Sequence, residues 1–135
     1  MKLIRLVNVA AILTCMMGQG CALFVVGAAA GAGAGTASYM GNEMRITREV
    51  SMDKAWAAAN DSIHELQFRI DRSKTAKDAM TGTLSAVTAQ DQPVRIQLFR
   101  QSDRLTEIRV RVGTFDTTAN RQSAQLIYDK INTRL

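Results

Sequence analysis

The sequence predicts an α+β domain in which an antiparallel sheet of about four to five strands carries two helices on one face. Two observations predict this class. Apolar residues recur at helical spacing near the beginning and near the end of residues 44–135. Between these two segments, apolar and polar residues alternate with a period of two, which is typical of half-buried strands. An apolar leader, expected to be helical, precedes the domain, so the predicted element order after it is β-α-β-β-β-β-α.

The leader begins with the layout of a secretory signal over residues 1–20. Lys2 and Arg5 supply its positive end. Residues 6–17 form an apolar stretch that is too short to span a bilayer as a helix. The sequence carries no further charge until Glu43, so this part of the chain is expected to be directed to a membrane.

Cys21 follows small residues at the end of this signal, as in a bacterial lipoprotein signal. There, the cysteine thiol receives a diacylglyceryl group, and after cleavage its amine receives a fatty acid such as palmitate. Cys15 is an alternative, although the branched Thr14 before it fits this step less well. An ordinary cleaved signal or an uncleaved anchor is the other alternative. Ala22, where an Asp would favour the inner membrane, points to the outer membrane.

Residues 22–40 are rich in Gly and Ala and carry no charge. Gly27, Gly31 and Gly35 are spaced by four, so on a helix they would share one face that a second helix can approach closely. This pattern leaves two structures open. One is an inserted helix that associates with other copies of the chain, and the other is an apolar tether or interfacial helix, because Gly lowers helix propensity. Residues 21–43 are therefore expected to link the signal to the domain.

The first half of the domain is expected to hold a strand at 44–51 and a helix that ends near Leu66. Ser51 or Asp53 is the predicted N-cap of this helix. His64 lies off the apolar stripe of the helix and is expected to be exposed. The stripe itself is predicted to be buried and consists of Trp56, Ala59, Ile63 and Leu66.

Alternation then indicates two strands, at 66–73 and 81–89, joined by a polar connection at 74–80. A turn at 90–93 follows, because it combines Asp with the single Pro of the chain.

The next two strands are predicted to form a hairpin whose loop is residues 102–104. Opposed residues of an antiparallel pair share a face, so placing Leu98 opposite Ile108 keeps the apolar side chains together. The core-side pairs are then Leu98–Ile108, Ile96–Val110 and Val94–Val112. The outer pairs are Phe99–Glu107, Gln97–Arg109 and Arg95–Arg111.

A final helix is predicted to start at Thr117 or Thr118. Its buried face follows the helical spacing of Ala124, Ile127, Tyr128, Ile131 and Leu135. With both helices on one face of the sheet, the other face is expected to stay open to solvent.

On this open face, Arg95, Arg109 and Arg111 form a candidate anion-binding surface. Arginines bind phosphate and carboxylate groups, whether on a lipid, a glycan or a partner protein. The alternative is an ordinary solvated face, in which Asp103 and Glu107 supply partial compensation.

The composition argues against several functional classes. One His and two Cys are too few for a conventional metal site, and no cofactor is predicted. The sequence contains no GxSxG, HExxH or phosphate-binding glycine loop, so we do not expect an enzyme, although an unrecognised site stays an alternative. Despite the net charge of +5, nucleic acid is not an expected partner, because an exported chain does not meet it routinely and the aromatic fraction is 5%.

Three segments resemble a family of small bacterial lipoproteins catalogued as a domain of unknown function. They are GCALFVVGAAAGAGAG at 20–35, SMDKAWAAA at 51–59 and RVRVGTFDTTANRQSAQLIYDKI at 109–131. The resemblance implies a lipid-anchored envelope protein with a small α+β domain, and it implies no catalytic residues.

Together, these observations predict an envelope lipoprotein anchored through Cys21, with residues 44–135 as a binding or structural module that faces the periplasm. Its partners would be the membrane and an envelope protein, lipid or glycan. The competing hypothesis is a membrane protein that forms homo-oligomers through a glycine zipper in residues 22–40.

Overall fold

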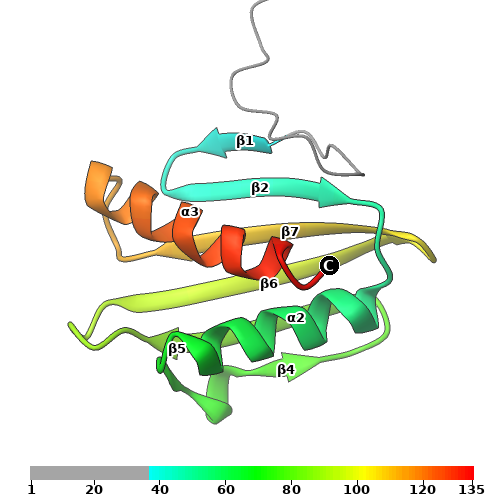
Figure 1. Cartoon of the computed structure of the whole chain (residues 1–135), viewed down its shortest axis with the longest axis horizontal. Coiled ribbons are helices and arrows are strands. Elements are labelled where there is room, and N and C mark those ends of the chain that lie inside the picture. The colour runs from blue at the N-terminus through cyan, green and yellow to red at the C-terminus, as the bar shows by residue number, and fades with distance from the viewer. Residues whose placement is uncertain (1–36) are drawn as a thin grey trace, which may run out of the picture. The chain divides into compact units, whose positions relative to one another are not determined.

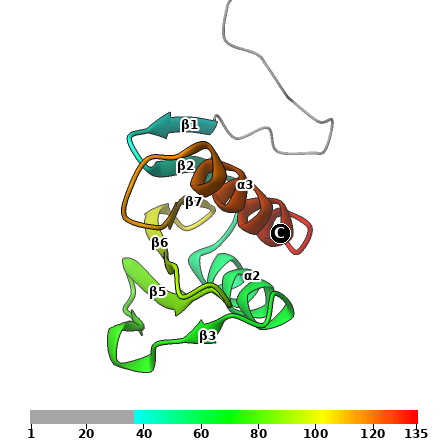
Figure 2. The same ribbon diagram turned by 90° about the vertical axis from the view of Figure 1, so that its left-hand side faces the viewer.

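The computed structural model describes residues 37–135, and it confirms the α+β class (Figure 1). Two helices, α2 (Met52–Glu65) and α3 (Thr118–Asn132), lie on the same side of an antiparallel sheet (Figure 2). The order of the strands in the sheet is β1-β2-β7-β6-β5-β3, and β4 also pairs with β5. The strands are β1 (Ala37–Met40), β2 (Glu43–Arg48), β3 (Arg69–Ile70), β4 (Ala76–Lys77), β5 (Thr81–Val87), β6 (Pro93–Ser102) and β7 (Leu105–Val112).

Several predictions concern residues outside the described part of the chain. They are the signal at 1–20, the lipidation of Cys21 and the packing role of Gly27, Gly31 and Gly35. Within residues 37–135, no helix is both long and apolar enough to cross a membrane.

The hairpin of β6 and β7 has the predicted register. Leu98 lies opposite Ile108, and the other predicted pairs follow on both faces. The apolar residues of both strands are buried between the sheet and the helices, which is why this register is strongly preferred. The predicted three-residue loop is wrong, because Ser102 pairs with Leu105 and leaves a two-residue turn. A bulge between Arg100 and Ser102 accommodates the extra residue.

The sheet begins earlier in the chain than predicted. Residues 37–40, expected to belong to the apolar segment 22–40, form the edge strand β1. Gly41 has a φ of +59°, which glycine adopts without strain, and this lets the chain reverse into β2. Tyr39 lies opposite Met44 on the core side of this pair. The sheet therefore begins before residue 44, where the folded domain was predicted to start.

The strand predicted at 66–73 is much shorter in the structure. Gln67 has a φ of +57°, and the Phe68 N–H donates to the Ile63 carbonyl over 3.1 Å, so these residues terminate α2 instead of starting a strand. Only the two residues of β3 pair with β5. A 3₁₀ helix, η1 (Arg72–Lys74), replaces the end of the predicted strand, and the short strand β4 lies where a polar connection was expected.

Helix α2 packs its small residues against the sheet. Ser51 is its N-cap, as one of the two alternatives predicted, and accepts from the Lys54 N–H over 3.3 Å. Trp56 is partly buried and packs against the core, where a Cβ on Gly82 would come within 2.8 Å of its ring. His64 is exposed, as predicted. The buried residues of the helix are Met52, Ala55, Ala58, Ala59, Ser62 and Ile63.

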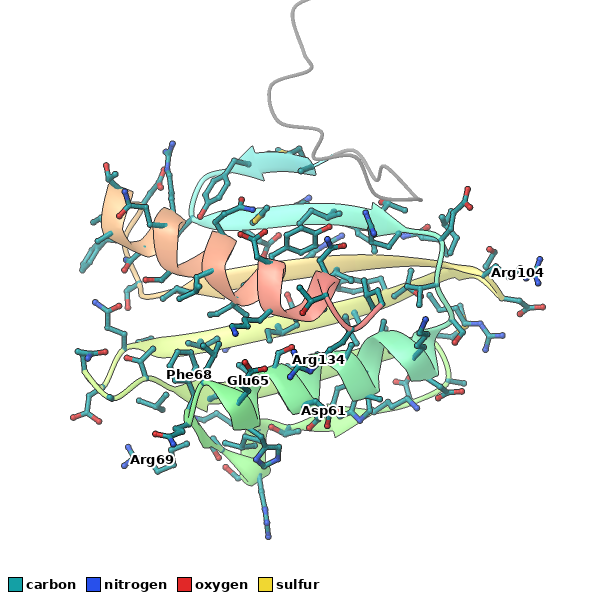
Figure 3. All side chains as sticks on the ribbon, viewed as in Figure 1. Asp61, Glu65, Phe68, Arg69, Arg104 and Arg134 are labelled. Atoms are coloured by element: carbon teal, nitrogen blue, oxygen red, sulfur yellow. The ribbon has the colours of Figure 1, made fainter. Side chains whose placement is uncertain are left out.

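Helix α3 covers β7 and β2 beside α2. Thr117 is its N-cap, and four of the five residues of the predicted face are buried, while Leu135 is partly buried. Glu65 at the end of α2 joins the two helices, because it accepts from Lys130 over 2.6 Å and also pairs with Arg134 (Figure 3). These hydrogen bonds lower the pKa of Glu65.

Candidate functional site

The open face of the sheet carries two cross-strand pairs of arginines. Arg95 on β6 lies opposite Arg111 on β7, as predicted. Arg109 on β7 lies opposite Arg45 on β2, a pair that the sequence analysis did not consider. All four belong to this face because the residues beside them in each strand are buried under the helices.

The pair of Arg45 and Arg109, hereafter the neutralised pair, is compensated by two glutamates. Arg45 donates to Glu43 and Arg109 donates to Glu107, each over 2.7 Å. The guanidinium of Arg109 also lies 4.1 Å from the centre of the Phe99 ring. The hydrogen bond to Glu107 raises the pKa of Arg109. Arg109 is thus bonded to its neighbours, so the geometry favours Arg95 and Arg111 over Arg109, and the three-arginine anion-binding surface stays a prediction.

The pair of Arg95 and Arg111, hereafter the open pair, is not compensated in this way. Both side chains are exposed, and neither forms an ion pair within residues 37–135. Glu43 lies opposite Arg111, but its carboxylate is bonded to Arg45. Like charges directly opposite each other destabilise a strand pair, so the open pair slightly lowers the stability of the sheet. An anion bound between the two arginines would remove this repulsion.

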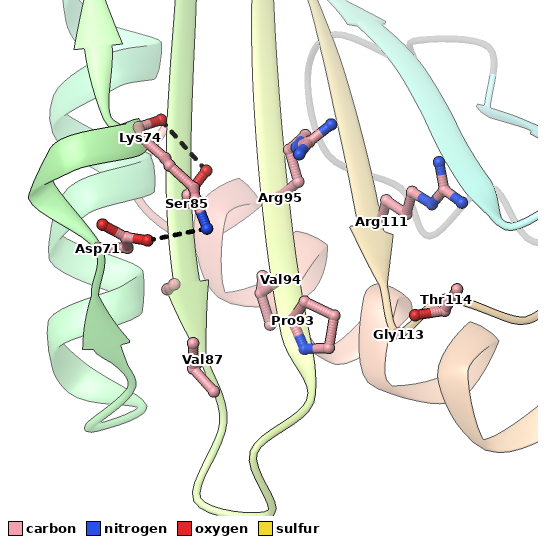
Figure 4. A pocket seen from close by; sticks show the side chains of 11 residues that line it. Asp71, Lys74, Ser85, Val87, Pro93, Val94, Arg95, Arg111, Gly113 and Thr114 are labelled. Carbon is pink, nitrogen blue, oxygen red and sulfur yellow. Dashed lines mark hydrogen bonds and ion pairs between the residues drawn. The ribbon is translucent and has the colours of Figure 1, made fainter.

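A pocket of about 290 Å³ lies beside the open pair (Figure 4). On one side are Arg95, Arg111 and Thr114, and on the other are Lys74, Asp71 and Ser85. The remaining lining residues are Ala86, Val87, Pro93, Val94 and Gly113.

The far wall of this pocket is built by η1. The Asp71 side chain accepts from the Ser73 N–H over 3.1 Å and caps the 3₁₀ helix. The Ser73 hydroxyl and Lys74 also bind this carboxylate, and together they lower the pKa of Asp71. The Ser85 hydroxyl donates to the Lys74 carbonyl over 3.2 Å and fixes η1 against β5.

Gly113 forms the end of the pocket beside Thr114. Its φ is +70°, and a Cβ there would lie 2.8 Å from Asn120 Cγ. Its N–H donates to the Pro93 carbonyl over 2.8 Å, and its carbonyl accepts from Asn42 over 3.0 Å. The glycine therefore lets β7 turn away toward α3 while the ends of β6 and β7 stay together.

Sequence reasoning missed four polar residues of the pocket, namely Asp71, Lys74, Ser85 and Thr114. Thr114 adjoins Gly113, so proximity to the end of β7 could have indicated it. Lys74 is brought to the sheet by η1, and two-residue strands carry no usable periodicity.

The chemistry that this pocket offers is the binding of anions. Two guanidinium groups present planar forks of N–H donors, and Thr114 adds a hydroxyl. Its one carboxylate, on Asp71, is already bound by Ser73 and Lys74. Within residues 37–135, no group of three or more His, Cys, Asp or Glu side chains is placed to hold a metal ion.

A family model described as "Protein of unknown function (DUF3568)" matches residues 2–134. A search of curated proteins found no match to this chain.

Proposed function

This chain belongs to the DUF3568 family, whose description states no activity, and we propose a function from the sequence and the site themselves. We propose that it is a bacterial envelope lipoprotein, anchored through Cys21, whose sheet domain binds anionic groups at the open pair. The domain would face the periplasm, with the outer membrane favoured by Ala22. The protein would act as a binding module and not as an enzyme.

One observation carries the binding function. Arg95 and Arg111 lie opposite each other without a carboxylate partner in the described domain, whereas the adjacent Arg45 and Arg109 each have one. Exposed arginines are common, but two unneutralised guanidinium groups in register beside a pocket match the fork geometry by which arginine binds phosphate and carboxylate.

The anchoring function is supported by the sequence. Lys2 and Arg5, the apolar stretch at 6–17 and the small residues before Cys21 form a signal of the lipoprotein type. Acylation adds apolar surface that a bilayer can bury, and stable anchoring needs more than one acyl chain, which this modification supplies.

Anchoring is tested by replacing Cys21 with Ala in the full chain. We expect this variant to move from the membrane fraction to the soluble fraction and to lose incorporation of labelled palmitate. Cys15→Ala is the matched control and should change neither. A Cys21→Ala protein that stays in the membrane with its signal removed would refute the lipid anchor and identify residues 22–40 as the anchor; the mass of the chain shows whether residues 1–20 are still present.

Anion binding is tested with the full chain in non-ionic detergent by NMR of the arginine side-chain Nε–H signals. Adding sulfate or phosphate should shift the signals of Arg95 and Arg111 and leave those of Arg45 and Arg109 almost unchanged. The double variant Arg95→Gln/Arg111→Gln should remove the response. Equal shifts in both pairs would show nonspecific screening and would contradict the proposed site.

The glycine spacing favours a second candidate function, namely self-association through residues 22–40. Gly31→Leu/Gly35→Leu would place large side chains on the shared face of such a helix. If the segment associates, this variant should lose the oligomers that chemical cross-linking traps in membranes. If the segment is a tether, cross-linking of the variant should match that of the unmodified chain.

A further inference from the structure

The charge around the open pair is the starting point for a more specific ligand. Arg45, Arg95, Arg109 and Arg111 occupy adjacent positions of the open face, and the two glutamates between them, Glu43 and Glu107, leave a net charge of +2. Lys74 and Asp71 at the far wall form an ion pair over 3.4 Å and add no net charge. The uncompensated charge therefore lies on Arg95 and Arg111.

We infer that the pocket beside Arg95 and Arg111 takes a phosphate monoester in its dianionic form. This inference rests on the proposed function and narrows its ligand class. A dianion neutralises both arginines, whereas a carboxylate or a phosphate diester carries one charge and leaves one arginine uncompensated.

The geometry of the open pair agrees with this charge. Side chains directly opposite each other in an antiparallel pair have Cβ atoms about 4.5–5.5 Å apart, so both guanidinium groups can reach one tetrahedral group. A phosphate monoester has three terminal oxygens, which is enough to accept from both forks, while its ester oxygen leads away. A carboxylate has two oxygens, and one arginine fork satisfies both.

The other walls leave room for a small ester group. Thr114 offers a hydroxyl beside Arg111, and Val87 and Pro93 form an apolar part of the lining (Figure 4). The volume of about 290 Å³ lies at the lower limit of the roughly 300–1,000 Å³ range for small-molecule pockets. The site thus suits a phosphate with a few attached carbon atoms, either as a soluble ester or as the headgroup of a lipid.

The first experiment measures affinity by calorimetry at pH 5 and pH 8, with the full chain in non-ionic detergent. The second pKa of a phosphate monoester is about 6, so the affinity for methyl phosphate should rise about tenfold between these values. The affinity for sulfate, a dianion at both values, should stay constant. Dimethyl phosphate and acetate should bind at least about tenfold more weakly than methyl phosphate at pH 8, because each uses one arginine.

The groups that face the ligand do not themselves change charge over this range. Arginine stays protonated, and the pKa of Asp71 is lowered by the hydrogen bonds from Ser73, so its carboxylate is already charged at pH 5. Lys74 is paired with that carboxylate. His64, the single histidine of the chain, is on α2, which covers the opposite face of the sheet.

Variants separate the roles of charge and geometry. Arg95→Gln or Arg111→Gln should each weaken methyl phosphate binding by about tenfold. The double variant Arg95→Lys/Arg111→Lys keeps the charge but removes the forks, and it should retain only part of the affinity. Arg104→Gln is the matched control, because it removes an exposed arginine at the hairpin turn, away from this pocket (Figure 3), and should have no effect.

The second experiment distinguishes the two sources of the phosphate. Phosphatidic acid, a phosphate monoester lipid, or phosphatidylglycerol, a diester lipid, is added to the detergent micelles that hold the full chain, and the affinity for each lipid is measured. Tighter binding to phosphatidic acid than to methyl phosphate identifies a lipid headgroup, and the reverse identifies a soluble ester; both support the inference. Equal affinity for the two lipids, or for acetate and methyl phosphate, would overturn it while leaving anion binding intact. Failure to bind any of these anions would overturn the proposed binding function as well.

Discussion

The open face of this sheet carries two arginine pairs in adjacent rows, and only one of them is neutralised. Arg45 and Arg109 lie opposite each other, as do Arg95 and Arg111, and both pairs involve β7. In the neutralised pair each arginine donates to a glutamate over 2.7 Å, and in the open pair neither arginine has such a partner within residues 37–135. The presence of two opposed arginines alone therefore does not determine whether the pair is neutralised or open.

The difference arises from the residues two positions away in the same strand, which share the sheet face. Arg45 and Arg109 each follow a glutamate by two residues, in Glu43-x-Arg45 and Glu107-x-Arg109. The corresponding neighbours of the open pair are neutral or basic, namely Pro93 and Gln97 for Arg95, and Arg109 and Gly113 for Arg111. An arginine on this face is thus neutralised by a glutamate two positions earlier in its own strand, whereas Glu43, which lies opposite Arg111, is bonded to Arg45 instead.

The largest effect on stability is expected when the two glutamates that compensate the neutralised pair are replaced. Glu43→Gln/Glu107→Gln leaves Arg45 and Arg109 uncompensated, and it should lower the free energy of unfolding by about 1–2 kcal/mol, because two partly buried ion pairs are lost. Urea unfolding of the full chain in non-ionic detergent measures this loss. The variant should also bind a second sulfate in calorimetry.

Glu49→Gln is the control for that variant, because Glu49 is exposed and has no ion pair in the described domain. It should change neither stability nor stoichiometry. If the double glutamate variant still binds a single sulfate, then compensation by Glu43 and Glu107 is not what separates the two pairs.

The opposite change introduces a carboxylate that neutralises Arg111 of the open pair. Arg95→Glu places a carboxylate opposite Arg111, and it should abolish anion binding while raising the free energy of unfolding by about 0.5–1 kcal/mol relative to Arg95→Gln. The gain in stability should fall as salt is added, because the new pair is exposed to solvent. An Arg95→Glu protein that binds methyl phosphate normally would show that the site lies elsewhere.

A smaller effect on stability is expected when the Phe99 ring, which lies against Arg109, is replaced. Phe99→Leu keeps an apolar side chain but removes the cation–π contact with Arg109, and it should cost about 0.5–1 kcal/mol. Affinity for methyl phosphate should stay the same, since neither Arg95 nor Arg111 forms a cation–π contact with this ring in the described structure. A large loss of affinity would mean that the two pairs act as one site.

The smallest effect on stability is expected from the open pair itself. Arg95→Gln removes a repulsive neighbour of Arg111 and no ion pair, so the free energy of unfolding should change by less than about 0.5 kcal/mol. Unfolding in urea at low salt, without added anion, tests this. A loss of more than about 1 kcal/mol would show that Arg95 has a structural role, and its assignment to binding would then be wrong.

The sequence was sufficient to predict the centre of the sheet. From Val94 to Leu98 in β6 and from Ile108 to Val112 in β7, every second residue is a large apolar side chain, and a shift of one residue would expose all of them. The same register places Arg95 opposite Arg111, so the open pair was predicted from the core of the domain. The ion pair of Arg109 with Glu107 was anticipated only as partial compensation of the whole face, because the sequence alone does not determine which arginine Glu107 binds.

The rest of the site depends on elements that carry little local signal. β1, β3 and β4 have four, two and two residues, so alternation cannot be recognised within them. The reversal at Gln67 uses a positive φ at a residue that is not glycine, and no composition rule points to it. Lys74 reaches the pocket only because this reversal and η1 return the chain to β5, so its place is set by long-range packing.

The close approach of Asn120 to Gly113 predicts a pattern of substitutions across the family. The missing side chain of Gly113 is replaced in space by Asn120, whose amide donates to the Phe115 carbonyl over 2.7 Å. A side chain at position 113 would collide with Asn120, so we expect the residues at these two positions to change together. Across homologues we expect positions 113 and 120 to co-vary, with any larger residue at 113 accompanied by a smaller one at 120. The shape of this end of the pocket would then depend on Asn120, a residue of α3 that is not part of the pocket lining.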